Sequence, residues 1–132
     1  MHTAAPATLV LHLEGITCTF PARSATSLSF TAVRDVTLSV GVGEFVSVVG
    51  PTGCGKSTLL NVAAGLLEPS SGRIDVFGTR LMGINRRAGY MFQTESLMPW
   101  RTALQNVMAG LEFRGSAAAR DQAQAWLKRV GL

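Results

Sequence analysis

The sequence predicts an α/β fold with an added antiparallel β layer. Two stretches of alternating apolar and polar residues come early in the chain, too close together for a crossover helix between them. A glycine-rich loop follows, set between a β-branched apolar run and a segment rich in Ala and Leu. Two further helical patterns come after it. Strands first, then a glycine loop, then helices indicate this fold class.

Apolar periodicity and turn residues predict the order of the elements. Strands are expected where apolar and polar residues alternate or β-branched residues run together, and helices where Leu and Ala dominate. Thr102 is expected to cap one helix, and Lys128 and Arg129 suit the last turn of another. The expected elements are a strand from Leu9 leading to Phe20, an exposed loop over 21–29, strands over 33–42 and 44–49, a helix over 57–67 stopped by Pro69, a strand over 73–77, and helices over 103–112 and 117–130.

One motif predicts the chemistry of the chain. It is Gly50-Pro51-Thr52-Gly53-Cys54-Gly55-Lys56-Ser57-Thr58, which fits the P-loop pattern G-x-x-x-x-G-K-[ST]. Its glycines let the backbone adopt positive φ and approach a ligand closely, so that the amides converge on nucleotide phosphates. Lys56 adds charge at the outer phosphates, and the Ser57 hydroxyl is suited to ligate Mg²⁺. The motif predicts a P-loop NTPase core in which all nine residues bind the nucleotide.

Composition sets limits on the class of protein. The chain has 132 residues, of which 47% are hydrophobic and 15% charged, so a sizeable core is expected. Its net charge is +4, but the basic residues are spread out, and nucleic acid is not an expected partner. Two cysteines, one of them Cys54 inside the P-loop, fit a reducing cytoplasm. No stretch is apolar and long enough to span a bilayer, so membrane association is expected only through partners.

The residues around the P-loop resemble the ATP-binding subunit of an ABC transporter. The resemblance rests on Gly43-Glu44-Phe45 before the motif, Ala64-Gly65-Leu66 after the helix, and Met91-Phe92-Gln93 further on. It implies a partial ABC-type ATP-binding domain over residues 8–132, with a β subdomain, P-loop, Q-loop and the start of a helical subdomain. Residues 1–7 are expected to form a flexible tail. ATP and Mg²⁺ are the implied cofactors.

The resemblance assigns roles to further residues. Gln93 matches the Q-loop glutamine, which in the family contacts Mg²⁺ near the γ-phosphate, so Lys56 and Gln93 are the implied catalytic residues and Ser57 and Gln93 the implied metal ligands. Phe20 is the better match to the aromatic residue that stacks on adenine, with plain core packing as an equal alternative. Phe30 is the weaker candidate.

The segment Leu97-Met98-Pro99-Trp100 resembles the Leu-x-Pro-Trp stretch that follows the Q-loop in the importer subfamily for nitrate, alkanesulfonates and taurine. In that subfamily it abuts a membrane subunit, which suits an exposed Trp100; packing of Trp100 in the chain's own core is the alternative. The implied partners are transmembrane permease subunits and a second ATP-binding subunit, with a solute-binding protein acting indirectly. The implied location is the cytoplasmic face of the cell membrane.

Three family motifs are absent from the sequence. It contains no Leu-Ser-Gly-Gly-Gln signature, no apolar run ending in Asp-Glu (Walker B), and no histidine after the P-loop. The chain is therefore expected to be truncated before the signature and Walker B motifs, and inactive as an ATPase by itself. Two alternatives stay open: a non-catalytic nucleotide-binding remnant or interaction module, and an unrelated P-loop enzyme such as a small-molecule kinase.

Overall fold

The structure is a computed structural model that describes residues 9–21, 28–94 and 96–132. The chain divides into two compact units, Met1–Tyr90 and Met91–Leu132, which are described separately below. The tail predicted over residues 1–7 and most of the loop predicted over 21–29 lie outside the described residues. The single domain predicted over residues 8–132 stays a prediction.

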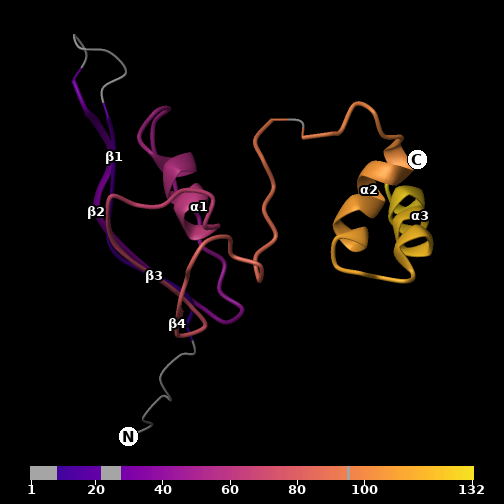
Figure 1. Cartoon of the computed structure of the whole chain (residues 1–132), viewed down its shortest axis with the longest axis horizontal. Helices are drawn as coiled ribbons and strands as arrows, with labels where there is room; N and C mark the ends of the chain where they lie inside the picture. Colours follow the sequence, from indigo (N-terminus) through magenta and orange to yellow (C-terminus); the bar gives the residue numbers. More distant parts are fainter. Residues whose placement is uncertain (1–8, 22–27, 95) are drawn as a thin grey trace, which may run out of the picture. The chain divides into compact units, whose positions relative to one another are not determined.

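The first unit is built on an antiparallel sheet with the strand order β2-β1-β3-β4 (Figure 1). Each neighbouring pair is antiparallel, and for β1 and β2 this was expected from the short spacing between the early strand patterns. The short strand β4 was not predicted; a tight turn at Phe77 and Gly78, both with positive φ, connects it to β3. The strands are β1 (Leu9–Phe20), β2 (Phe30–Gly41), β3 (Ser71–Val76) and β4 (Thr79–Arg80).

A bulge near Gly15 decides which side chains of β1 enter the core. Leu13 and Ile16 are both buried although they lie three positions apart, because the pairing of β1 with β2 shifts between these positions. Gly15 (φ 59°) and Asp35 (φ 50°) both adopt the left-handed conformation there. Such a shift changes the phase of the alternation. It places Leu13, Ile16 and Cys18 together in the core.

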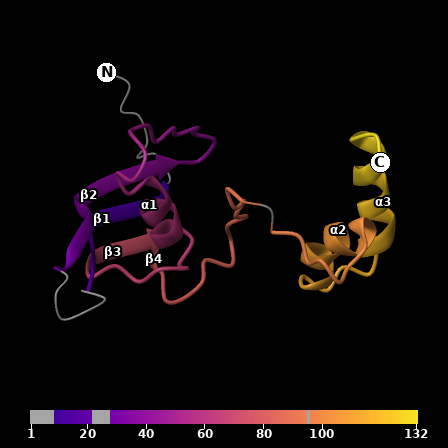
Figure 2. The ribbon, with the colours of Figure 1, turned by 90° about the horizontal axis from the view of Figure 1, so that it is seen from above.

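Helix α1 (Lys56–Ala63) covers one face of this sheet (Figure 2). Its buried residues, Leu59 and Val62, are those that a helical period places on one side. The largest fully buried side chains are Leu13, Ile16 and Val62. The core consists of Leu13, Ile16, Cys18, Val33, Leu59, Val62 and Ile74.

The prediction that this helix continues to residue 67 is wrong, because the helix ends at Ala63, four residues earlier, where Gly65 closes it. Gly65 adopts φ 69°, its amide donates to the carbonyl of Val62, and the amide of Leu66 donates to the carbonyl of Asn61. This pair of hydrogen bonds is a Schellman motif, in which glycine closes a helix. The prediction relied on Pro69 as the stop and overlooked the glycine.

The prediction of a strand over residues 44–49 is also wrong for the described structure. These residues have no strand conformation and pair with none of the four described strands. A turn at the end of β2, in which the Glu44 amide donates to the Gly41 carbonyl, leads the chain out of the sheet. A β-branched run forms a ladder only where a neighbouring strand accepts its hydrogen bonds. Phe45 and Val49 are accordingly 92% and 86% exposed.

The second unit contains helices α2 (Ala103–Glu112) and α3 (Ala119–Arg129). The prediction of a helix over residues 103–112 is confirmed, and the second helix starts two residues later than expected. The two helices pack through small side chains, with Ala109, Ala119 and Ala123 buried. Among the described residues, no helix is both long enough and apolar enough to cross a bilayer.

Candidate nucleotide-binding site

The P-loop connects residues 44–49, which pair with none of the described strands, to α1. Its glycines are needed where φ is positive and where a Cβ atom would collide with a neighbour. Gly53 (φ 82°) and Gly55 (φ 94°) adopt a conformation that other residues rarely take. A Cβ atom at Gly55 would also lie 2.4 Å from the carbonyl oxygen of Ala32 on β2. Gly55 therefore lets the start of α1 contact the sheet directly, and this contact fixes the loop beside β2.

The Lys56 side chain turns back into the loop that precedes it. Its Nζ atom donates to the carbonyl oxygens of Gly50 (2.8 Å) and Pro51 (2.6 Å). Two carbonyl acceptors hold the ammonium group across the loop, and they use two of its three donors. The loop is thus arranged around a positive charge.

The first turn of α1 has no cap of its own. Within the described residues, no side chain accepts a hydrogen bond from its N-terminal amides, and its first turn carries no acidic residue. The Ser57 hydroxyl is exposed and has no hydrogen-bond partner in the described part of the chain. Free amides and the positive end of the helix dipole attract an anion. A phosphate group therefore fits this end of α1.

Phe20 and Phe30 lie opposite each other at one end of the β1–β2 pair. Phe20 is 39% exposed and Phe30 is 60% exposed, so neither is a core residue. Phe30 lies two residues before Ala32, whose carbonyl oxygen faces Gly55. The strand register thus places both aromatic residues close along the strands to Ala32, which contacts the P-loop. The sequence alone did not show that the two candidates form a pair.

The two cysteines have different surroundings. Cys54 is exposed in the P-loop, with its Sγ atom 3.6 Å from Lys56 Nζ. Cys18 is buried in the core, and burial raises the pKa of its thiol. Since thiolate is the reactive form, both the burial of Cys18 and the raised pKa of its thiol lower its reactivity.

Gln93 is an exposed residue of the second unit, whereas the P-loop belongs to the first. The P-loop residues and Phe20 are therefore brought together in one described unit, and Gln93 is not among them. Its role as a metal ligand and catalytic residue stays a prediction.

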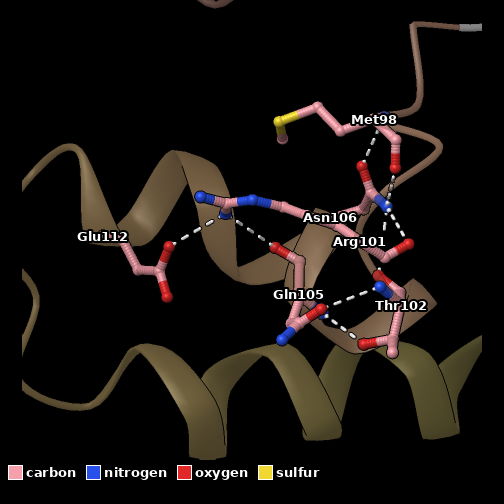
Figure 3. A network of polar contacts seen from close by, with 6 residues as sticks. All are labelled: Met98, Arg101, Thr102, Gln105, Asn106 and Glu112. Carbon is pink, nitrogen blue, oxygen red and sulfur yellow. Dashed lines mark hydrogen bonds and ion pairs between the residues drawn. The ribbon is translucent and has the colours of Figure 1, made fainter.

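Met98 and Arg101, which lie on either side of Trp100 in the sequence, are fastened to the start of α2 (Figure 3). The side-chain oxygen of Asn106 accepts from the Met98 N–H, and its side-chain nitrogen donates to the carbonyls of Met98 and Arg101. Arg101 also pairs with Glu112 at 3.1 Å. Trp100 itself is 78% exposed, so it does not pack in the core of its unit. Sequence reasoning missed Asn106 as the residue that holds this segment.

A family model described as "ABC transporter" matches residues 33–132. The chain belongs to this family. The match covers the P-loop, α1, Gln93 and both helices of the second unit, and it agrees with the resemblance drawn from the motifs.

Two curated members of the ABC transporter family are 44% identical to this chain. The taurine import ATP-binding protein TauB of Pseudomonas aeruginosa aligns with 82% of the chain. The aliphatic sulfonates import ATP-binding protein SsuB 1 of Burkholderia lata aligns with 91% of it. The aligned part is 44% of the first relative and 34% of the second, so the chain spans less than half of their length.

Solved ABC cassettes have the same fold. A dimeric ATP-binding cassette, MJ0796, in a post-hydrolysis state bound to ADP and Pi, superimposes with a TM-score of 0.76 at 30% sequence identity. The match covers 89% of this chain and 56% of that cassette. The α/β class with an antiparallel sheet and a P-loop core is confirmed.

Proposed function

We propose that this chain is part of the ATP-binding subunit of an ABC importer and that it binds ATP at the P-loop. The observation that carries the proposal is the uncapped start of α1, which lies beside the Lys56 ammonium and behind two glycines of positive φ. Family membership makes ATP the expected ligand. The arrangement supplies amide donors, a cation and open space, which a triphosphate requires.

In this proposal the P-loop residues act on the phosphates by position and charge. The amides of Lys56, Ser57 and Thr58, which have no acceptor within α1, donate to phosphate oxygens. Gly50 and Pro51 accept two of the Lys56 donors and the third faces only the weak acceptor Cys54 Sγ at 3.6 Å, so a phosphate oxygen would replace the sulfur without changing the orientation of the ammonium. Both effects stabilise negative charge at the terminal phosphate.

The Ser57 hydroxyl and the Gln93 side-chain carbonyl would hold Mg²⁺, since oxygen ligands suit this ion. The fit rests on an exposed Ser57 in the first turn of α1. Bound there, Mg²⁺ would neutralise phosphate charge. Gln93 also lies four residues before Leu97, where the segment with Trp100 begins, so it suits a link between nucleotide and partner.

Phe20 and Phe30 are proposed to contact the adenine base, with Phe20 as the stacking residue. Stacking of a base on an aromatic side chain contributes about 1–3 kcal/mol in nucleic-acid complexes. We predict that Phe20→Ala weakens ATP and GTP binding by about that much, because both purines stack. Isothermal calorimetry checks this. Unchanged ATP affinity in Phe20→Ala, with a loss in Phe30→Ala, would reverse the assignment.

The transported solute is proposed to be a small sulfonate such as taurine, because both 44% identical relatives are named for sulfonate import. Nitrate, expected from the motif, is the other candidate. The exposed Trp100 beside Pro99 suits a contact with a transmembrane permease subunit. A second ATP-binding subunit is proposed as partner, since the MJ0796 cassette is dimeric. With these partners, we propose that the chain lies on the cytoplasmic face of the membrane.

A non-catalytic nucleotide-binding module is the second candidate. The sequence contains no Asp-Glu pair after an apolar run, so it lacks the motif whose carboxylate would orient the attacking water. We infer that this chain by itself binds ATP without hydrolysing it. Steady-state phosphate release above background, abolished by Lys56→Ala, would contradict this inference.

The decisive test of nucleotide binding compares ATP with adenosine. We predict that Lys56→Ala weakens ATP by about tenfold or more, because a charge-assisted hydrogen bond contributes about 1.5–3 kcal/mol, and leaves adenosine unchanged. Lys128→Ala, at the other lysine of the chain, is the matched control and should bind ATP normally. Calorimetry with both ligands measures the difference. Equal losses for ATP and adenosine would show that Lys56 does not contact phosphate.

A further inference from the structure

A basic hollow lies in the first unit, away from the P-loop. It has a volume of about 420 Å³ and is formed by the turn after β3, by β4 and by the loop that follows. This volume is in the range of small-molecule sites. The charged, aromatic and exposed apolar residues that line it are Phe77, Arg80, Met82, Ile84, Arg86 and Arg87.

The hollow carries positive charge that its surroundings do not neutralise. Three arginines line it, and no Asp or Glu does so among the described residues. The nearest carboxylate by strand register is Asp75, opposite Arg80, but its Oδ2 atom pairs with Arg73 Nε at 2.9 Å. Arg80 and Arg86 form no ion pair within the described part of the chain. Their guanidinium groups are therefore available to an added anion.

Phe77 supplies an aromatic wall at a strained position. It adopts φ 49°, which costs a bulky residue energy and is usually left to Gly, Asn or Asp in such turns. Its ring is 46% exposed, and the Arg87 guanidinium lies 5.0 Å from the ring centroid. An exposed aromatic residue kept at an unfavourable φ beside an arginine suggests a binding role.

The loop that bears the arginines is held in place. The Asn85 amide donates to the carbonyl of Ala64, its side-chain nitrogen donates to the carbonyl of Ala63, and its side-chain oxygen accepts from the Arg87 amide. A Cβ atom at Gly65 would lie 2.0 Å from the Gly83 carbonyl oxygen, so the loop rests directly on the end of α1. Binding there would therefore cost little loop entropy.

We propose that this hollow binds a small organic anion in which an oxyanion group is attached to an apolar body. Guanidinium forks of Arg80 and Arg86 match the oxygens of a sulfonate, carboxylate or phosphate. Phe77 and the exposed Met82 and Ile84 cover the apolar body. The site is distinct from the P-loop, because no P-loop residue lines it and its loop contacts the C-terminal end of α1, whereas the P-loop leads into the N-terminal end.

Calorimetry with benzenesulfonate tests the site, since this probe combines both chemical features. We expect Arg86→Ala to weaken binding by about tenfold or more, as for the loss of a charge-assisted hydrogen bond. Arg86→Lys should recover part of the affinity, because charge is kept and the fork is lost. Inorganic sulfate should bind more weakly than benzenesulfonate. Circular dichroism melting of each variant verifies that it is folded.

Two control variants distinguish binding in this hollow from binding at the P-loop and from general attraction to a basic surface. Arg34→Ala removes an exposed arginine on β2 that does not line the hollow, and Lys56→Ala disables the P-loop; both should leave benzenesulfonate binding unchanged. Equal losses in Arg34→Ala and Arg86→Ala, or a loss in Lys56→Ala alone, would overturn the proposal. So would binding to phosphatidylglycerol vesicles that depends on Arg86 while benzenesulfonate binding does not, since the surface would then serve a lipid headgroup.

Discussion

Helices α1 and α2 begin in opposite ways. At α2 the Thr102 hydroxyl accepts from the Gln105 amide, and the Gln105 side chain accepts from the Thr102 amide, which forms a complete capping box (Figure 3). At α1 the N-cap is Gly55, in the left-handed conformation and without a side chain. The first helix therefore leaves its terminal donors free, whereas the second satisfies them from its own sequence.

The difference separates a helix start that is stabilised by its own side chains, at α2, from one that is suited to binding, at α1. A capping box stabilises a helix by about 1 kcal/mol, and a glycine cap contributes no such side-chain bond. The chain gives up that stabilisation at the helix end where the proposed triphosphate would supply the missing acceptors. It keeps the stabilisation at α2, where a firm helix start holds the segment with Trp100.

The largest effect is expected from substitution of the α1 cap. Gly55→Ala should destabilise the first unit by about 2–4 kcal/mol, because the new Cβ atom meets the Ala32 carbonyl and the residue is strained at positive φ. Gly53→Ala is the matched control, with a similar φ and no atom within 4 Å of its Cβ. It should cost only about 1–2 kcal/mol. Urea unfolding measures both, and equal costs would contradict the tight contact with β2.

Phosphate should protect one helix start and not the other. At 100 times its dissociation constant a ligand stabilises the state that binds it by about 2.7 kcal/mol. We expect inorganic phosphate to slow hydrogen exchange at the amides of Lys56, Ser57 and Thr58, with no change at Ala103 and Leu104. Lys56→Ala should reduce this protection. Equal protection at both helices would mean that the uncapped end of α1 is not a specific anion site.

A smaller effect is expected from removal of the α2 cap. Thr102→Ala should destabilise the second unit by about 1 kcal/mol, since it breaks the capping box. Nucleotide affinity should stay unchanged. Thr102→Ser, which retains the hydroxyl, is the control and should cost only a few tenths of that. Thermal unfolding followed by circular dichroism gives the shift, and a loss as large in Thr102→Ser would contradict the capping role.

The sequence by itself determined the features that depend on neighbouring residues. The P-loop motif predicted positive φ at its glycines, and Gly53 and Gly55 adopt it, whereas Gly50 does not. The start of α2 followed from Thr102, whose cap is made within four residues. Local chemistry of this kind is complete within one turn of chain, so composition and spacing are enough to predict it.

Only the tertiary structure decided the features that need a distant partner. The run over residues 44–49 stays unpaired because a strand needs a neighbour that sequence pattern does not supply. Gly65 closes α1 through local hydrogen bonds, but only the fold shows that a side chain at this position would collide with the Gly83 carbonyl eighteen residues away. The pairing of Phe20 with Phe30 depends on the register between β1 and β2, which bulges shift more than once. Contacts across such separations are set by packing of the whole unit, and no local pattern records them.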